Sequence, residues 1–329
     1  MSDRKSQLTI KSRSGPGYLS IVLPFYNEAN NVKKLIKEIC LVCDDNCDSY
    51  EIVCIDDGSR DDTLKELLEA RELCNSVKVI QLSRNFGQDA AITAGIEHVS
   101  GDVLVIMDSD LQHPPSLIPD MLDQWRAGYD VVCMLRENRH SESVFTRFLK
   151  NIYYKLLGKI SNHKMVPNTG NFRLMDKSAY QALMKLPEKS RYLYGLYQWI
   201  GFPTTYVKYT ADRRHAGESK WHIFSLLNKA ISGIVSFSTI PLRFWSVFGA
   251  SIAFLSFLYG LYIIVKTVVF GVQLPGFATI TTLILFFGGL QLFSIGVIGE
   301  YLASLFMEAK NRPVYLIYER YGFDEDPGS

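Results

Sequence analysis

Two carboxylates with one residue between them, Asp108 and Asp110, follow the apolar run 103–107. Such a run indicates a buried strand, and carboxylates at its end supply the hard oxygen ligands that Mg²⁺ and Mn²⁺ prefer. The side-chain amide of Gln112 can add a third oxygen. We therefore predict a divalent metal site, with Mg²⁺ or Mn²⁺ as the cofactor, at Asp108, Asp110 and Gln112.

Polar residues also follow two earlier apolar runs. Pro24, Tyr26 and Glu28 lie at the end of the first run, and Asp56 and Asp57 lie at the end of the second. Carboxylates crowded together are unfavourable unless a cation or hydrogen-bond donors lie among them. We predict that these groups share one site with the metal ligands.

The elements that must position these groups alternate along the chain. The pattern predicts strands at 19–24, 51–55, 77–82, 103–107 and 130–135, and helices at 30–40, 63–73, 88–99 and 116–126. Strand and helix in alternation predict a mostly parallel sheet covered by helices on both faces. Ligands of such sheets bind beyond the carboxyl ends of the strands, where the acidic groups lie.

Composition and missing motifs exclude several classes of protein. Lys and Arg total 35 against 34 for Asp and Glu, so the chain has no basic excess for nucleic acid. There is no GxxxxGK[ST] loop and no GxGxxG after the first strand, which argues against ATPases and dehydrogenases. Cys40, Cys43 and Cys47 cluster without a fourth zinc ligand, so we predict reduced thiols. The polar segment 1–17 is predicted to be a disordered lead-in and not a signal peptide.

The last third of the chain is strongly apolar. The run 244–265 carries no charge and makes about 33 Å of helix, and a second helix is expected at about 277–305. Basic residues precede the first span and follow the second, which places both termini in the cytoplasm. The segment just before the first span has broadly helical apolar spacing and predicts amphipathic helices on the bilayer surface.

The ordered set of motifs resembles the polyprenyl-phosphate glycosyltransferases of the GT-A fold, family 2, such as bactoprenol glucosyltransferases and dolichyl-phosphate mannose synthase. The resemblance covers about residues 19–318. It rests on Pro-x-Tyr-Asn-Glu from Pro24, Asp-Asp-Gly-Ser from Asp56, Ser-Arg-Asn-Phe-Gly from Ser83, Asp-Leu-Gln-His-Pro-Pro from Asp110, Asn-Thr-Gly-Asn-Phe-Arg-Leu-Met from Asn168, Arg-His-Ala-Gly-Glu-Ser-Lys from Arg214, Gly-Glu-Tyr from Gly299 and Arg312-Pro313.

The resemblance implies a role for each matching residue. By this resemblance, Asp108 and Asp110 lie near the metal and the diphosphate of the donor, and Gln112 lies close to them. Asp110 is also a candidate catalytic residue. Near the phosphate of the donor or the acceptor, the resemblance places Arg214, Ser219 and Lys220. Two of these, Arg214 and Lys220, are candidate catalytic residues. The alternative role for these two is a basic patch that contacts anionic lipid headgroups. The nucleotide pocket is expected to contain Pro24, Tyr26, Glu28, Asp56, Asp57, Arg84 and Asp108.

One position departs from the family pattern. Relatives usually have an acidic residue, a candidate catalytic base, where this chain has Asn171. An amide is no base at neutral pH, but a phosphate monoester has a second pKa near 6 and is already an anionic nucleophile. Asn171 is therefore a candidate for orienting the acceptor, and an inactivating substitution is the alternative.

The sequence thus predicts inverting transfer of a hexose from a nucleotide sugar, a UDP-hexose being expected, to polyprenyl phosphate such as undecaprenyl phosphate. The alternatives are a processive polysaccharide synthase and a catalytically idle membrane protein that binds nucleotide sugar. The expected location is the plasma (inner) membrane of the cell envelope, and a homo-oligomer through the transmembrane region is left open. The predicted parts are a lead-in at 1–17, a cytosolic GT-A domain at 18–218, juxtamembrane helices at 219–243, two transmembrane helices at 244–307 and a cytosolic tail at 308–329.

Overall fold

A computed structural model of the chain describes residues 13–15, 17–136, 169–189, 191–209, 240–270 and 276–323. The predicted juxtamembrane helices lie outside these residues, except for the start of the helix that begins at Ile240. All six cysteines are described and free, as the sequence predicts.

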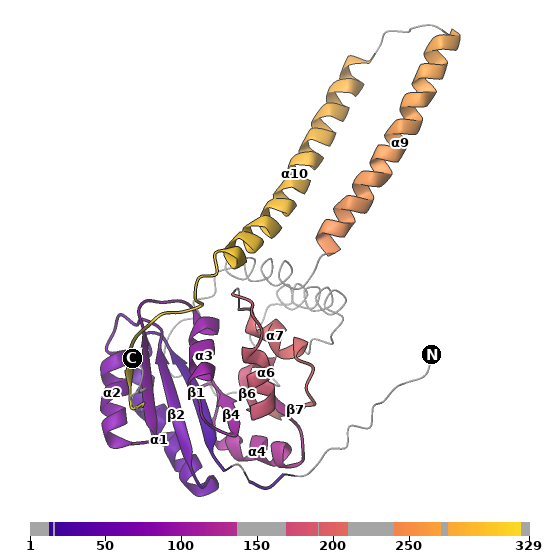
Figure 1. The fold of residues 1–329 in the computed structure, drawn as a ribbon. Coiled ribbons are helices and arrows are strands. Elements are labelled where there is room, and N and C mark those ends of the chain that lie inside the picture. The colour runs from indigo at the N-terminus through magenta and orange to yellow at the C-terminus, as the bar shows by residue number, and fades with distance from the viewer. Residues whose placement is uncertain are drawn as a thin grey trace.

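One eight-stranded sheet forms the centre of the catalytic part (Figure 1). Its strands lie in the order β7-β5-β6-β4-β1-β2-β3-β8. β1 pairs in parallel with β2 and β4, β2 with β3, and β5 with β7, while β6 and β8 pair antiparallel with their neighbours. The strands are β1 (Leu19–Phe25), β2 (Tyr50–Asp56), β3 (Val77–Leu82), β4 (Val103–Ile106), β5 (Val131–Arg136), β6 (Thr169–Asp176), β7 (Thr204–Tyr209) and β8 (Ile317–Tyr321).

Helices cover both faces of the sheet because the strands bury side chains on both sides. In β1, Ile21, Leu23 and Phe25 face one layer of helices, whereas Val22 faces the other. The first layer contains α1 (Ala29–Asn46), α2 (Thr63–Leu73) and α4 (Ile118–Arg126), and the second contains α3 (Gln88–Glu97), α6 (Lys177–Met184) and α7 (Leu193–Trp199).

The five predicted strands and four predicted helices are all present; β3 and α2 have the predicted bounds, and the others differ at one or both ends. The helix expected at 30–40 continues to Asn46, and a 3₁₀ turn, Pro115–Leu117, precedes α4. The sequence does not predict β6, β7 and β8. They include the two antiparallel strands, β6 and β8, and the two edges of the sheet, β7 and β8, which strand–helix alternation does not reveal.

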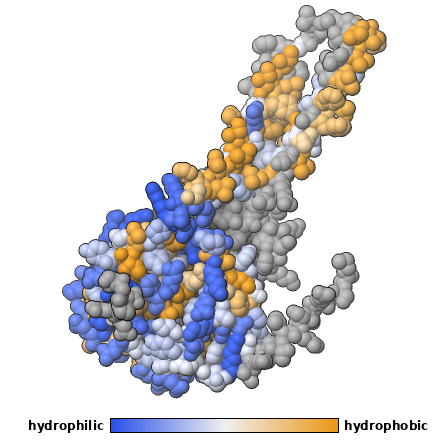
Figure 2. Space-filling view, viewed as in Figure 1, coloured by the Kyte–Doolittle hydropathy of each residue, from blue (hydrophilic) through white to orange (hydrophobic). Residues whose placement is uncertain are grey.

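Two long helices, α9 (Ile240–Phe270) and α10 (Phe277–Ala309), project side by side from the catalytic part (Figure 1). The rings of Trp245 and Phe293 meet at 5.3 Å between the pair. Apolar side chains cover the hairpin, in contrast to the mixed surface of the catalytic part (Figure 2). Within the described residues, Phe286–Ala309 is long and apolar enough to cross a membrane, and Val247–Tyr259 is a shorter apolar stretch. The prediction of two spans is thus supported for one helix only.

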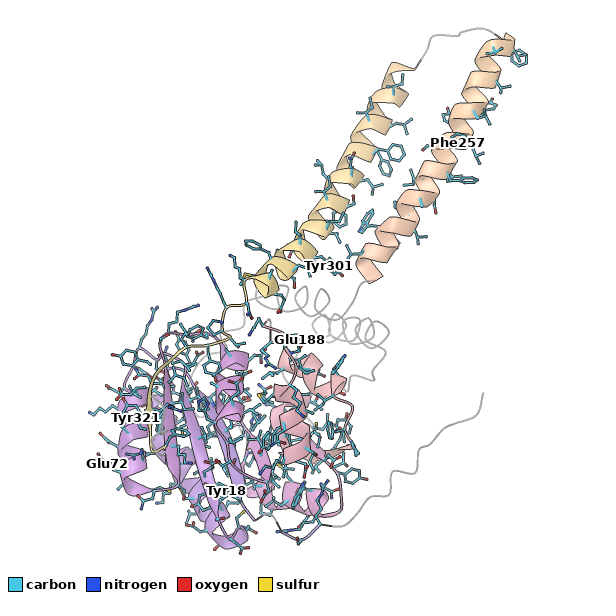
Figure 3. The ribbon with its side chains drawn as sticks, in the orientation of Figure 1. Tyr18, Glu72, Glu188, Phe257, Tyr301 and Tyr321 are labelled. Carbon is cyan, nitrogen blue, oxygen red and sulfur yellow. The ribbon has the colours of Figure 1, made fainter. Side chains whose placement is uncertain are left out.

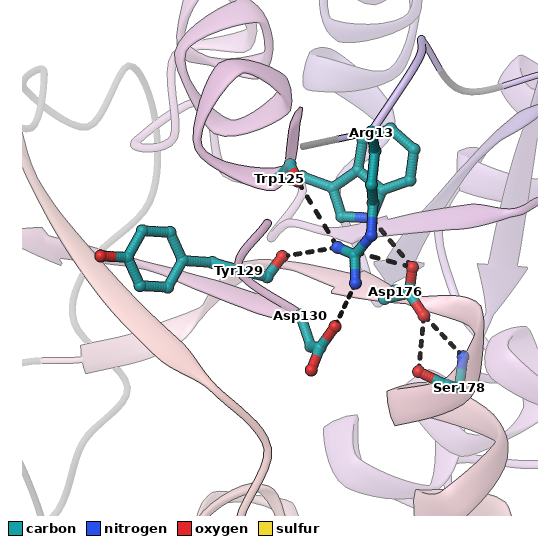
Figure 4. A network of polar contacts seen from close by, with 6 residues as sticks. All are labelled: Arg13, Trp125, Tyr129, Asp130, Asp176 and Ser178. Atoms are coloured by element: carbon teal, nitrogen blue, oxygen red, sulfur yellow. Dashed lines mark hydrogen bonds and ion pairs between the residues drawn. The ribbon is translucent and has the colours of Figure 1, made fainter. Parts of the chain in front are cut away.

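The sheet edge opposite the strands' carboxyl ends holds the N-terminal segment (Figure 4). The guanidinium of Arg13 donates to the Tyr129 carbonyl at 3.0 Å, forms an ion pair with Asp130 and lies 5.2 Å from the Trp125 ring. Arg13 falls within the lead-in predicted to be disordered, yet these contacts hold it against the sheet.

Candidate active site

A cavity of about 420 Å³ lies at the carboxyl ends of the strands. This edge of the sheet faces the hairpin, because the chain that leaves α10 first meets β3 at its last residue, Leu82 (Figure 1). The cavity is lined by Pro24, Phe25, Tyr26, Glu28, Asp57, Asn85, Gly87, Gln88, Ala91, Asp108, Ser109, Asp110, Gln112, His113, Arg136, Gly170 and Tyr209.

Most of the predicted site residues therefore meet in one place. Pro24, Tyr26, Glu28, Asp57, Asp108, Asp110 and Gln112 all line the cavity. Asp56 and Arg84 do not. Asp56 is buried and accepts a hydrogen bond from the Ser59 amide at 3.2 Å, so it stabilises the turn after β2. The Arg84 guanidinium lies 4.3 Å from the Phe86 ring.

Asp57 is held by the loop 83–87 that follows β3. Its two carboxylate oxygens accept hydrogen bonds from the backbone amides of Phe86 at 2.7 Å and Gly87 at 2.9 Å. Burial raises the pKa of Asp57, while these two hydrogen bonds and the charge of Arg84 oppose the rise. The loop and Asp57 therefore form one preorganised unit.

Asp108 is surrounded by hydrogen-bond donors. Its Oδ1 accepts from the Gln88 amide at 2.7 Å, and its backbone N–H donates to Nδ1 of His113 at 3.0 Å. The His113 ring stacks on Phe172 at 4.8 Å, which fixes its orientation. Burial raises the pKa of Asp108 and the charge of Asp110 adds to the rise, while His113 and hydrogen bonds from Asn171 and Gln88 oppose it.

Asn171 therefore lies against the carboxylate at which a metal is predicted. The amide of Asn171 makes a hydrogen bond to Asp108. A carboxylate in its place could not donate this hydrogen bond when ionised. In this chain Asn171 stabilises the charged form of Asp108.

Two residues of the cavity loops have a left-handed backbone that is uncommon outside glycine. Asn27 has φ 53° and Leu111 has φ 59°. Leu111 lies between the candidate metal ligands Asp110 and Gln112 and packs into the core with 7% of its surface exposed. Residues in such conformations persist only where the surrounding structure holds them, and they concentrate at functional sites.

The donor set fits a divalent cation in part. Asp108 and Asp110 line the same cavity, where their carboxylate oxygens could bind a cation. No group of three or more His, Cys, Asp or Glu side chains within the described residues is arranged to hold a metal. The remaining ligands would be water and substrate phosphate, as is usual for Mg²⁺. Gln112 Oε1 accepts a hydrogen bond from Arg136 at 2.8 Å, so it would have to exchange that contact for the metal.

Arg136 is a site residue that the sequence did not reveal. It is the last residue of β5 and the one Lys or Arg side chain among the described residues that line the cavity. Its Nε is buried and has no hydrogen-bond partner within the described part of the chain. The one feature of the sequence that could have indicated Arg136 is its position at the carboxyl end of a predicted strand. That position alone does not distinguish a site residue from a surface arginine. Arg214, Ser219 and Lys220, predicted to bind phosphate, lie outside the described residues.

Comparison with known proteins agrees with this geometry. Residues 20–184 match the family model of glycosyl transferase family 2, and residues 240–305 match the GtrB C-terminal hairpin. An uncharacterized glycosyltransferase of Synechocystis sp. is 42% identical over 309 residues, 94% of this chain and 97% of the relative. The SfII prophage-derived bactoprenol glucosyl transferase of Shigella flexneri is 39% identical over 300 residues, 91% of this chain and 97% of the relative.

The fold also matches a solved structure. Glucosyl-3-phosphoglycerate synthase of Mycobacterium tuberculosis, in complex with Mn²⁺, UDP and glucosyl-3-phosphoglycerate, superposes with a TM-score of 0.51 at 18% identity. The match covers 66% of this chain and 77% of that chain, and it supports the GT-A-like fold. The family model and the relatives show that this chain is a glycosyltransferase that belongs to glycosyl transferase family 2.

Proposed function

We propose that the protein transfers one hexose from a nucleotide sugar to polyprenyl phosphate. The observation that carries the proposal is the placement of one acidic cavity, lined also by Arg136, at the sheet edge that faces an apolar hairpin. The name of the Shigella relative, a bactoprenol glucosyl transferase, supports a lipid acceptor. A UDP-hexose is the expected donor.

The donor would bind across the carboxyl ends of β1, β2 and β4. Asp57, fixed by the loop 83–87, would accept hydrogen bonds from the base of the nucleotide, and Tyr26, which is 36% exposed, could contact the nucleotide. Asp108 and Asp110 would hold a divalent cation at the diphosphate. That cation would neutralise charge on the leaving nucleoside diphosphate.

The acceptor phosphate would enter from the side of the hairpin. Its second pKa near 6 leaves it largely dianionic at neutral pH, so it can attack the anomeric carbon without a strong base. Arg136 is the lining residue whose fixed positive charge suits phosphate oxygens. Attack opposite the leaving diphosphate in a single displacement inverts the configuration at that carbon.

The hairpin gives this reaction its location. We propose that α9 and α10 anchor the protein in the plasma membrane, with the catalytic part and both termini on the cytoplasmic side. Basic residues on both flanks of the hairpin support this orientation. Anchoring holds the cavity near the plane of the acceptor phosphates, which raises their effective concentration.

Asn171 favours a second candidate, an idle membrane protein that binds nucleotide sugar without turnover. Relatives of the resembled type carry an acid at this position, and an amide cannot serve as a base. A labelled-sugar assay with polyprenyl phosphate in detergent separates the two candidates. In a donor screen we expect transfer from one UDP- or GDP-hexose. Transfer should be lost in Asp110→Ala. It should also be lost when EDTA is added to the wild-type protein, and Mn²⁺ should then restore it. Donor binding without transfer from any sugar would favour the idle protein.

A further inference from the structure

The segment 313–323, the C-terminal strap, returns from α10 to the outer edge of the catalytic sheet. It contains β8, which pairs antiparallel with β3 so that Ile317 lies opposite Leu82 and Tyr321 opposite Val79. Figure 3 labels Tyr321 at this outer edge, far along the strand from the hairpin. The strap thus connects the hairpin directly to the sheet that carries the cavity.

The strap first contacts the sheet at the loop that holds Asp57. The carbonyl of Leu316 accepts a hydrogen bond from the backbone N–H of Ser83 at 2.9 Å. Ser83 is the first residue of the loop 83–87, whose Phe86 and Gly87 amides bind the Asp57 carboxylate. A short chain of bonded groups therefore connects the strap to the nucleotide side of the cavity.

A second contact fixes the strap against α3. The Tyr315 hydroxyl donates a hydrogen bond to Oε2 of Glu97, the last residue of α3. The first residue of the same helix, Gln88, lines the cavity and donates to Asp108. Tyr315 packs against the core cluster that also contains Leu82 and Ile92. The strap is therefore braced on both elements that flank the loop, β3 and α3.

Contacts also hold the helix before the strap and the far end of the strap. In α10, which precedes the strap, both carboxylate oxygens of Glu308 accept a hydrogen bond from the Lys189 backbone amide, at 3.0 and 2.9 Å. At its far end, the Phe323 ring lies 5.2 Å from the Lys78 ammonium and 5.9 Å from the His98 ring. These contacts hold the helix that leads into the strap and the last residue of the strap.

We propose that the C-terminal strap positions the loop 83–87 and so sets the affinity of the cavity for the nucleoside diphosphate of the donor. The identity of that ligand rests on the proposed function. The hairpin and the nucleotide site are then coupled through Glu308, Tyr315 and Leu316. Protecting the exposed edge of β3 would be a sufficient role for β8 alone. That role would not require the contact of Tyr315 with α3 or the contact of Leu316 with the loop 83–87.

The test compares the same chemical change at two tyrosines of the strap. Tyr315→Phe removes the hydroxyl that binds Glu97, and Tyr318→Phe is the matched control at a side chain that is 71% exposed. Hydrogen exchange is measured on the full-length protein in detergent without ligand, and UDP affinity is measured with Mn²⁺ present. In Tyr315→Phe we expect about tenfold faster hydrogen exchange at residues 83–87 and unchanged exchange in β1 and β4, because the free energy of a hydrogen bond to a charged group corresponds to about that factor. We also expect UDP to bind several-fold more weakly. Tyr318→Phe should match wild type.

Glu97→Gln and the double variant complete a cycle, in which the two changes should not add because they remove one interaction. Unchanged exchange at residues 83–87 in Tyr315→Phe would overturn the proposal, as would faster exchange throughout the sheet, which would indicate a general loss of stability. If the loop responds but wild type does not bind UDP, the positioning role stands and the proposed donor class fails.

Discussion

At the scale of single residues, Asn171 is the position where this chain departs from the family it resembles. Its amide makes a hydrogen bond to Asp108, so the substitution changes both the base available to the reaction and the support of a candidate metal ligand. We expect Asn171→Asp to change kcat little at neutral pH, because the acceptor phosphate is already largely dianionic there and leaves a base no proton to remove. A gain of about 10²-fold, which is a typical contribution of a general base, would contradict this expectation. The measurement is kcat for both forms from about pH 6 to 8.5, which spans the second pKa of the phosphate.

The same pair of proteins also reports on metal binding. Equal rates at every pH would show that the acceptor phosphate needs no base and that Asn171 is not a lesion. A fall in kcat with weaker Mn²⁺ binding would show that the hydrogen bond to Asp108 matters more than a carboxylate at this position.

Asp176 gives a prediction about pH and stability. It caps α6 by accepting from the Ser178 amide at 2.9 Å, and it accepts from Trp125 Nε1 at 3.0 Å with Arg13 at 3.8 Å (Figure 4). Burial opposes ionisation, but the hydrogen bonds from Ser178 and Trp125 lower the pKa of Asp176 below its ordinary 3.8. A depressed folded-state pKa stabilises the protein above the unfolded pKa, and this contribution is lost as the pH falls through the folded pKa.

Asp176→Asn keeps a capping side chain and removes the charge. We expect it to lower the free energy of unfolding by about 1 kcal/mol at pH 7. The same loss should appear at pH 5, and a smaller one should appear near pH 4 as the wild-type carboxylate begins to protonate. The measurement is thermal or urea unfolding of both forms at the three pH values. A difference that grows as the pH falls would contradict the assigned direction of the pKa shift.

The site was predictable from sequence to the extent that its residues stand at the ends of recognisable strands. Asp57, Asp108 and Asp110 follow apolar runs, and all three line the cavity. Asp56 is adjacent to Asp57 and equally acidic, but its carboxylate binds the turn after β2 instead. Arg136 lines the cavity because antiparallel pairing with β6 brings β5 into the sheet, and no local pattern encodes that pairing.

At the scale of elements, the turn after β2 packs on the loop after β3. Gly58 has φ 65°, and a Cβ at that position would lie 2.5 Å from the Arg84 carbonyl carbon and 2.7 Å from the Asn85 nitrogen. Both are backbone atoms of the loop that holds Asp57, so a side chain at Gly58 must displace that loop. The β2 and β3 connections therefore act as one unit.

Gly58→Ala should lower the free energy of unfolding by more than the 1–2 kcal/mol that a left-handed backbone roughly costs. It should also weaken UDP binding, because the loop 83–87 must shift. Gly201→Ala is the matched control, since Gly201 has φ 67° and its nearest atom to a new Cβ is 3.9 Å away. Melting temperature and UDP affinity are measured for both variants. Equal effects would show that only backbone strain matters and that the two loops are not packed as described.

The parallel pairing of β1 to β4 follows from the sequence, whereas the two antiparallel strands, β6 and β8, do not. β1 to β4 are apolar runs separated by helices, a pattern that predicts parallel strands but not their order in the sheet. β8 has only partly buried or exposed residues, Ile-Tyr-Glu-Arg-Tyr, and follows a helix of 33 residues. Its partner β3 lies far earlier in the chain, and pairing across such a separation leaves no signal in a local pattern.

At the scale of the whole molecule, the carboxyl ends of the strands, where the cavity lies, face the hairpin, and the strap runs from the hairpin to the sheet (Figure 1). The proposed topology predicts that the turn between α9 and α10 faces away from the cytoplasm. Gly276→Cys at that turn should react with an impermeant thiol reagent applied to intact cells. Leu73→Cys, at an 84% exposed position on α2, should react only after the membrane is opened. The reverse pattern would separate the cavity from a cytoplasmic nucleotide donor.

Transfer of one hexose to a lipid phosphate can be tested by analysis of the lipid product. Purified protein in detergent is incubated with undecaprenyl phosphate and the donor found in the screen, and the lipid is analysed by mass spectrometry alongside the released nucleoside diphosphate. We expect one hexose per lipid, linked through phosphate with inverted anomeric configuration, and one nucleoside diphosphate released for each. Lipid carrying a polymer of sugars, or nucleoside diphosphate released without any glycosylated lipid, would contradict this expectation.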